Sequence, residues 1–439
     1  MTVFTEFQAV VFAGGYGNKM TDVTNNIPKP LLPVANVPLF WYALNTLHRN
    51  YIYDIILITN EKCDEKVREF LKNDDLPPLP GLNIEIVNPG PENDDWGTVE
   101  ALRFVADRIK HDFILFSGDI VSDINLHEML QQHRAEDSTM TVCLTENAIV
   151  SGSAPGPVVK KPPKYRDFSI LPADSNRLLF LAPEDDFEEM KPKHQLFVKY
   201  QNVHLTARYS NCHIYIMKHG LLNVIKSLDD NFSSITAEFI PYILELQYGK
   251  RDKSIMRMIF GETDLHDEEV HGDYEHHHQH DKETSSSQNH DQEVQCFAYK
   301  ATIDAVQTMA RCNTIGTWFE ANKSVLLTPK NFFTAEGINI AGLSNDRKLP
   351  GVDGRSAVDE EAQIGTNVKI VGSVIMKGAK IGNGAQIFNS VICQRVIIGE
   401  KCHIGASIIG NDQSIPDGTR LTNSVLQNEG EMDMDESFN

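Results

Sequence analysis

Over the first 150 residues, short apolar runs alternate with stretches in which apolar residues recur every three or four positions. The runs predict buried strands at 7–13, 54–59, 83–87, 113–116 and 140–144. The helical repeats predict helices at 39–47, 61–71 and 98–109, and patterned structure returns at 211–217 and 237–247. Because parallel strands are joined through helices, this alternation predicts a doubly wound, Rossmann-like α/β domain with a mostly parallel sheet.

The final third of the chain carries a shorter repeat of about six residues. Ile-Gly pairs recur at intervals of 17, 17 and 6 residues, beginning at Ile364, Ile381, Ile398 and Ile404. The same register continues through Ile370, Val374, Ile387, Val391 and Ile392. A coil of three short strands takes about 18 residues, so an interval of 17 indicates one deletion at a corner. We interpret this region as a left-handed parallel β-helix; the alternative is a strand meander with chance Ile-Gly pairs.

Composition separates a third kind of segment from these two. Residues 261–295 contain eleven acidic residues, seven histidines and one lysine, with few apolar residues. Such a segment buries too little apolar surface to offset its ordering entropy, so we predict a disordered insertion. Its clustered histidines at 276–278 and 280 are a candidate metal site, but a solvated loop is the favoured interpretation. The predicted domains are therefore 1–330 with this insertion, 331–428, and an acidic tail at 429–439.

Charge and cysteine content exclude several functional classes. The formal net charge is −21, which disfavours a general affinity for nucleic acid or for anionic membranes. The seven cysteines form no C-x-x-C motif, which is typical of reduced thiols in the cytosol. No apolar run reaches 18 residues and no signal peptide is recognisable, so we expect a cytosolic protein without a membrane span.

The first predicted strand ends in a glycine loop with candidate phosphate-binding groups. Gly14, Gly15 and Gly17 allow the backbone to approach a ligand and to direct N–H groups at a phosphate. Lys19 and Lys29 follow, and the prolines on both sides of Lys29 fix its backbone. Glycines in such turns are often purely structural, but the combination of this loop with P-K-P predicts a phosphate site.

The segment 7–33 resembles the signature of the nucleoside-diphosphate-sugar pyrophosphorylases, in which G-G-x-G-T-R-L precedes P-K-P. The resemblance implies a loop that wraps a nucleoside triphosphate and an arginine that stabilises the leaving pyrophosphate. Asn18, Lys19 and Met20 stand where that family has Thr, Arg and Leu. Lysine supplies a point charge, whereas the planar guanidinium of arginine can form two parallel hydrogen bonds to a phosphate. The resemblance therefore implies the fold of this family with an altered catalytic centre.

Other elements of the same family are recognisable to different degrees. The resemblance implies a magnesium ligand at Asp119 in F-S-G-D and a second acid at Glu238 in I-T-A-E-F-I-P-Y, which is one methylene longer than aspartate. Gly97 and Thr98 resemble the element that contacts base and sugar, although Thr98 is equally a candidate helix N-cap, and a cap is also the alternative for Asp119. The V-E-K-P element of the same family is resembled only superficially by residues 158–162.

Three longer segments narrow the resemblance. Residues 20–45, 233–244 and 311–323 are similar to the gamma subunits of eukaryotic translation initiation factor 2B. This resemblance implies a non-catalytic assembly and regulatory subunit with no cofactor and no metal. It implies a vestigial nucleotide pocket at Gly14, Gly15, Gly17, Lys19, Lys29, Gly97, Thr98 and Asp119.

The same resemblance implies particular partners. They are the epsilon subunit, the other subunits of factor 2B and, as the substrate of the complex, the GTPase initiation factor 2, with no direct contact to nucleic acid or membrane. Two alternatives stay open: an active sugar-1-phosphate nucleotidyltransferase, and a sensor that binds a nucleotide without chemistry.

Overall fold

The computed structural model describes residues 6–15, 20, 27–72, 76–93, 96–146, 155, 167–183, 191–229, 232–250, 252–261, 293–302, 306–333 and 349–426. All structural statements below concern these residues. Outside them lie Gly17, Lys19, the segment 158–162 that superficially resembles V-E-K-P, most of the acidic insertion and the tail at 429–439.

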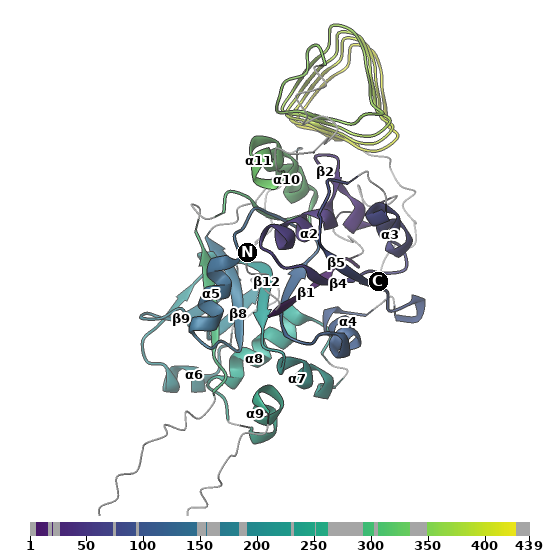
Figure 1. The fold of residues 1–439 in the computed structure, drawn as a ribbon. Coiled ribbons are helices and arrows are strands. Elements are labelled where there is room, and N and C mark those ends of the chain that lie inside the picture. The colour runs from purple at the N-terminus through teal and green to yellow at the C-terminus, as the bar shows by residue number, and fades with distance from the viewer. Residues whose placement is uncertain are drawn as a thin grey trace, which may run out of the picture.

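The N-terminal part is built on a seven-stranded sheet with the order β13-β8-β12-β6-β1-β4-β5 (Figure 1). Its strands are β1 (Phe7–Phe12), β4 (Asp54–Ile58), β5 (Asn83–Val87), β6 (Asp112–Ser117), β8 (Met140–Glu146), β12 (Tyr209–Met217) and β13 (Cys296–Ala301). Only β12 pairs in antiparallel fashion with its neighbours β6 and β8. The predicted mostly parallel α/β sheet is therefore confirmed.

Helices cover both faces of this sheet because its strands are apolar on both sides. One face packs against α4 (Thr98–Val105), α7 (Leu221–Ser227), α8 (Ile240–Leu246) and α9 (Lys253–Phe260). The other face packs against α2 (Leu39–Arg49), α3 (Asp64–Lys72) and α5 (His127–Ala135). Alternate side chains of β1 divide between the two cores, with Val10 in the first core and Ala9 and Val11 in the second.

Smaller elements extend this domain. A three-stranded antiparallel sheet contains β9 (Asp167–Pro172), β10 (Phe180–Pro183) and β11 (Val203–Thr206), with α6 (His194–Lys199) nearby in sequence. Two strand pairs are formed by β2 (Pro33–Val34) with β3 (Val37–Pro38) and by β7 (Ile120–Ser122) with β14 (Met309–Arg311). Two helices follow, α10 (Ile315–Leu327) and α11 (Pro329–Phe332), so the predicted domain boundary at 330 falls inside α11 and stays a prediction.

The C-terminal part is a parallel β-helix with three sheets. The β15 sheet contains β15 (Ala357–Val358), β18 (Val374–Ile375), β21 (Val391–Ile392), β24 (Ile408–Ile409) and β27 (Val425–Leu426). The β16 sheet contains β16 (Gln363–Ile364), β19 (Lys380–Ile381), β22 (Ile397–Ile398) and β25 (Ser414–Ile415). The β17 sheet contains β17 (Lys369–Val371), β20 (Gln386–Phe388), β23 (His403–Gly405) and β26 (Arg420–Thr422).

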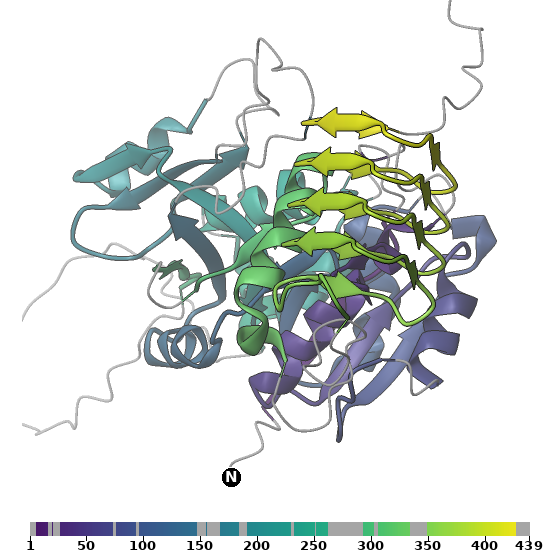
Figure 2. The ribbon, with the colours of Figure 1, turned by 90° about the horizontal axis from the view of Figure 1, so that it is seen from above.

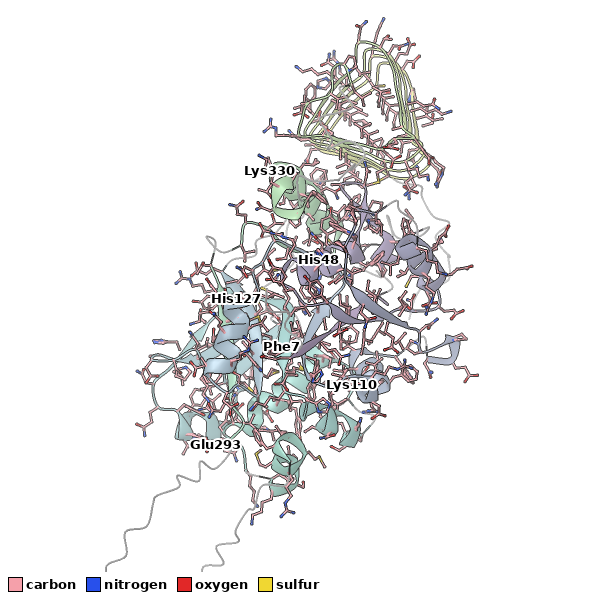
Figure 3. All side chains as sticks on the ribbon, viewed as in Figure 1. Phe7, His48, Lys110, His127, Glu293 and Lys330 are labelled. Carbon is pink, nitrogen blue, oxygen red and sulfur yellow. The ribbon has the colours of Figure 1, made fainter. Side chains whose placement is uncertain are left out.

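Each coil of this β-helix is 17 residues long, as the pairs Ile364–Ile381 and Ile370–Ile387 show. Figure 1 shows the coils along their axis as a triangle, and Figure 2 shows them stacked one after another. Side chains fill the interior of the triangle and project from its outside (Figure 3). The repeat of Ile-Gly pairs therefore confirms the predicted β-helix.

One face of the β-helix is covered by the α/β domain. Successive side chains of a strand point in opposite directions, so one of the two residues in each strand of the β15 sheet points outward. Both residues are nevertheless buried in β18, β21 and β24. They belong to the same apolar cluster as Trp41, Trp318 and Phe333, and Asn36 Nδ2 donates a hydrogen bond to the Ile375 carbonyl at 3.1 Å.

A ladder of buried serines joins successive coils. Ser390 Oγ accepts a hydrogen bond from the backbone N–H of Ser407 at 3.1 Å and donates one to the Phe388 carbonyl at 2.8 Å. The Phe388 carbonyl also accepts a hydrogen bond from the Ala406 N–H, so it keeps a partner if the hydroxyl is removed. Ser373 repeats the arrangement one coil earlier.

We expect Ser390→Ala to lower the free energy of unfolding by about 1–3 kcal/mol, because the buried Ser407 N–H loses its acceptor. Urea denaturation of the full chain measures this change. Ser414→Ala is the matched control, since Ser414 is exposed on the β-helix and should change stability by less than about 0.5 kcal/mol. Equal effects of the two substitutions would contradict the expected role of the ladder.

Candidate functional site

A cavity of about 290 Å³ lies at the carboxyl ends of β1, β4 and β6 and beside the start of α4. This is the edge at which parallel α/β sheets bind ligands. Its wall includes Gly14, Gly15, Lys29, Gly97, Thr98 and Asp119. Six of the eight residues predicted for the pocket therefore meet at one cavity, and the other two, Gly17 and Lys19, lie outside the described residues.

The most strongly buried charges of the site are those of Lys29 and Asp119. Lys29 Nζ lies 2.5 Å from Asp119 Oδ2, and the two residues are 9% and 8% exposed. Arg311 Nε donates to the same oxygen at 3.3 Å, while Ser117 Oγ donates to Asp119 Oδ1 at 2.6 Å. We call Lys29, Asp119 and Arg311 the charge cluster.

Two opposing effects set the ionisation of Asp119. Burial raises the pKa of its carboxyl. The charges of Lys29 and Arg311 and the hydrogen bonds from Lys29 and Ser117 lower this pKa, and together they outweigh the effect of burial. The pKa of Asp119 consequently lies well below its ordinary value, and the carboxylate is ionised with both oxygens engaged. One negative charge thus faces two positive charges, which leaves the charge cluster with an excess positive charge toward the cavity.

Local sequence explains how Lys29 and Asp119 reach each other. Pro28 and Pro30 flank Lys29 in a short 3-10 helix (Lys29–Leu31), which holds the backbone of the lysine. On the other side, a Cβ atom on Gly118 would lie 2.5 Å from the Phe12 carbonyl, to which the Gly118 N–H donates at 2.8 Å. Glycine at this position therefore lets the G-D turn approach β1.

The segment 311–323 holds the P-K-P region in place. Trp318 Nε1 donates to the Pro33 carbonyl at 2.8 Å, and the Ala35 N–H donates to Asn322 Oδ1 at 2.8 Å. Thr314 begins α10 with a reciprocal capping box. Both segments were recognised from the resemblance, but their contact was not predicted, and neither was the position of Arg311 at the cavity.

His213 is a second residue that sequence reasoning missed. It lies in a bulge of β12 with a φ of +53°, an uncommon conformation for a residue with a side chain. Arg311 Nη1 donates to His213 Nε2 at 2.7 Å, and burial and the charge of Arg311 hold the pKa of His213 well below its ordinary value. No local sequence pattern marks this histidine, because its partner is 98 residues away.

Gly97 and Thr98 have structural partners as well as a place in the cavity wall. A Cβ atom on Gly97 would lie 2.1 Å from Ser233 Oγ and 2.4 Å from the Ser233 carbonyl. Thr98 is the first residue of α4, and Gly97 is the N-cap, so the alternative interpretation of Thr98 as an N-cap is wrong. The Thr98 hydroxyl instead accepts a hydrogen bond from the Ile235 N–H at 2.8 Å.

Glu238 lies in a π-helical turn (Ile235–Phe239) that leads into α8, and it is absent from the described wall of the cavity. Its Oε2 accepts hydrogen bonds from the N–H groups of Ser233 and Ser234 at 2.6 and 2.7 Å. Glu238 therefore caps its own helix.

The arrangement of the two candidate carboxylates does not fit a magnesium site. The ionised Asp119 carboxylate already forms ion pairs with Lys29 and Arg311, and the Glu238 carboxylate accepts hydrogen bonds from backbone N–H groups. Among the described residues, no group of three or more His, Cys, Asp or Glu side chains is arranged to hold a metal ion.

Two protein families match separate parts of the chain. Residues 8–152 match the family model described as Nucleotidyl transferase, and residues 352–435 match the model described as GMPPB C-terminal domain. The chain thus joins a domain similar to nucleotidyl transferases to a β-helix.

Among curated proteins, the chain is similar to translation initiation factor eIF2B subunit gamma. It is 28% identical to the Caenorhabditis elegans protein over 73% of this chain and 68% of that relative. It is 29% identical to the Schizosaccharomyces pombe protein over 56% of this chain and 52% of that relative, so the matches span half to two thirds of these relatives. These findings confirm the resemblance to the gamma subunits.

A mannose-1-phosphate guanylyltransferase of Mycobacterium tuberculosis is also similar, with 31% identity over 32% of this chain and 37% of the relative. Within the described residues, no helix is long and apolar enough to cross a membrane.

Proposed function

We propose that this chain is a gamma-type, non-catalytic subunit of a guanine-nucleotide exchange factor for initiation factor 2, with an assembly and regulatory role in translation initiation. The observation that carries the proposal is the charge cluster: the candidate metal-binding carboxylate is occupied by Lys29 and Arg311 in a chain whose relatives include gamma subunits. Its partners would be an epsilon subunit and the other subunits of the complex in the cytosol.

The described residues at the cavity would stabilise the domain instead of performing chemistry. Asp119 links Lys29 of the P-K-P segment to Arg311 at the end of β14. Arg311 in turn contacts His213 in the central sheet. We therefore interpret Gly14, Gly15, Gly17, Lys19, Lys29, Gly97, Thr98 and Asp119 as a vestigial nucleotide pocket, and we assign a structural role to those of its members that the structure describes.

Reconstitution of the exchange factor tests the proposal directly. We expect a complex that contains this chain to release guanine nucleotide from initiation factor 2 faster than the same complex assembled without it. The isolated chain should produce no exchange, because the proposed role depends on assembly. Exchange by the isolated chain, or an equal rate without the chain in the complex, would contradict the proposal.

A second candidate function is sugar-1-phosphate nucleotidyl transfer, which the similarity to mannose-1-phosphate guanylyltransferases favours. The reaction would join a nucleoside monophosphate unit to a sugar phosphate and release pyrophosphate. We expect no pyrophosphate from this chain with GTP, mannose 1-phosphate and magnesium, because Asp119 is held by two cations. A pyrophosphate assay checks this expectation.

The variant Asn18→Thr/Lys19→Arg restores two signature residues of the pyrophosphorylases and leaves the charge cluster intact. We expect it to remain inactive in the same assay if the charge cluster blocks metal binding. Turnover by the unmodified chain would replace the assembly proposal with the enzymatic one.

A further inference from the structure

The β17 sheet of the β-helix presents a column of exposed polar side chains. Lys369, Gln386, His403 and Arg420 occupy equivalent positions in four successive coils, and all four are exposed. Because neighbouring parallel strands are about 4.8 Å apart, three steps place Lys369 and Arg420 about 14 Å apart along the β-helix. We call these four residues the basic column.

The cations of the basic column have no carboxylate partner within the part of the chain that the structure describes. Lys369 Nζ lies 5.5 Å from the centre of the Phe388 ring, and the rings of Phe388 and His403 are 5.5 Å apart. No ion pair involves Lys369, His403 or Arg420 among the described residues. The positive charge of this face is therefore not neutralised by the β-helix itself.

Other cations of the β-helix, in contrast, form ion pairs with carboxylates. Arg395 binds Asp412 through two hydrogen bonds of 2.6 and 2.7 Å. Lys377 Nζ lies 2.7 Å from Glu361. These pairs show that carboxylates neutralise cations at a corner of the same coils, whereas the outward positions of the β17 sheet contain no acidic residue.

A second column on the same face supplies apolar surface. Val371 and Phe388 are half-buried beside Lys369, and Gly405 contributes no side chain at the next position. Arginine and aromatic side chains beside apolar surface are typical of protein interfaces. The β15 sheet is covered by the α/β domain, whereas the outward residues Lys369, Gln386, His403 and Arg420 of the β17 sheet are exposed, so this face is accessible to a partner.

We propose that the β17 sheet is the docking surface for an acidic helix of another subunit in the assembly, an inference that rests on the proposed function. Charge complementarity selects an acidic partner. Carboxylates three helical turns apart lie about 16 Å apart, close to the roughly 14 Å between the two cations Lys369 and Arg420. A helix is favoured over nucleic acid because the formal net charge of −21 repels the densely charged backbone of a nucleic acid more strongly than a helix with a few carboxylates.

Charge reversal tests this surface in the full chain. We expect Lys369→Glu/Arg420→Glu to lower the recovery of at least one partner subunit in an affinity purification by about tenfold or more, measured by quantitative mass spectrometry. The matched control is Lys110→Glu/Lys380→Glu, which changes the net charge equally at exposed lysines outside the basic column. Lys110 lies on the α/β domain away from the β-helix (Figure 3). The control should recover partners as the unmodified chain does.

The neutral variant Lys369→Gln/Arg420→Gln separates lost attraction from misfolding. It should keep the thermal unfolding temperature of the unmodified chain and give a smaller loss of partner than charge reversal. If the charge-reversed variant recovers as much of the partner subunits as the unmodified chain does, the proposed docking surface is wrong, but the proposed function is unaffected.

Two other outcomes would also overturn the inference. Failure of the unmodified chain to recover any subunit of the exchange factor would remove the proposed function, and the inference with it. If ribonuclease releases the same partners that charge reversal releases, the face binds nucleic acid and the docking of an acidic helix is wrong.

Discussion

Asp119→Asn should lower the free energy of unfolding by about 3–5 kcal/mol, the usual effect of removing one partner from a buried ion pair. The substitution preserves the shape of the side chain but leaves the Lys29 ammonium, 9% exposed, without a counter-ion. Arg311 contacts the same oxygen and loses its carboxylate partner as well, although its contact with His213 stays. Guanidinium chloride denaturation of the full chain measures the change.

Asp412→Asn is the matched control for this experiment. Asp412 pairs with Arg395 through two hydrogen bonds, but the pair is exposed on the β-helix. Exposed pairs contribute about 0–1 kcal/mol, so the control should change stability little. A loss below about 1 kcal/mol for Asp119→Asn would contradict the structural role of the charge cluster.

The pH dependence of this difference has a defined sign. The pKa of Asp119 is lower in the folded chain than in the unfolded chain, so its contribution to stability is complete above the unfolded pKa of about 4. It is lost as the pH falls below that value. The stability difference between the unmodified chain and Asp119→Asn should therefore be largest near neutral pH and shrink in acid.

Trp318→Ala should have an effect of similar size, about 3–5 kcal/mol, because a large and fully buried aromatic side chain is removed. Trp318 belongs to the apolar cluster that includes both the α/β domain and the β-helix. The substitution also removes the hydrogen bond to the Pro33 carbonyl. Denaturation monitored by circular dichroism measures the loss.

Trp318→Phe separates packing from hydrogen bonding. It retains most of the apolar surface and should cost about 1–2 kcal/mol through the lost N–H donor and imperfect packing. Trp96→Ala is the control, because Trp96 is 36% exposed and should tolerate truncation better. If Trp96→Ala and Trp318→Ala destabilise equally, the contact between 311–323 and the P-K-P segment is less important than the structure implies.

The parts of the fold that depend on local patterns could be predicted from the sequence. The apolar run at β1 and the 17-residue interval between Ile364 and Ile381 each require only neighbouring residues to be interpreted. The covered β15 sheet could not be predicted, because its burial depends on contact with the α/β domain. A hydrophobic repeat indicates which residues are apolar, but it does not identify which outer face is shared with another part of the chain.

The same distinction applies to the candidate site. Lys29 and Asp119 were identified because each lies in a recognisable motif at the end of a predicted strand or loop. Arg311 is 192 residues from Asp119, and its contact depends on the pairing of β14 with β7. Glu238 follows Ser233 and Ser234 by five and four residues, which is not the three-residue spacing of a capping box, so its hydrogen bonds to their N–H groups could not be predicted from a local motif.

The most direct test of the assembly role is a gentle affinity purification of this chain from the cytosol of its own cells, with stoichiometry measured by mass spectrometry. Our account predicts recovery with an epsilon-type subunit in equal amount, together with the other subunits of the exchange factor and initiation factor 2. Recovery of the chain alone, or only with copies of itself, would contradict the account and favour an independent nucleotidyltransferase.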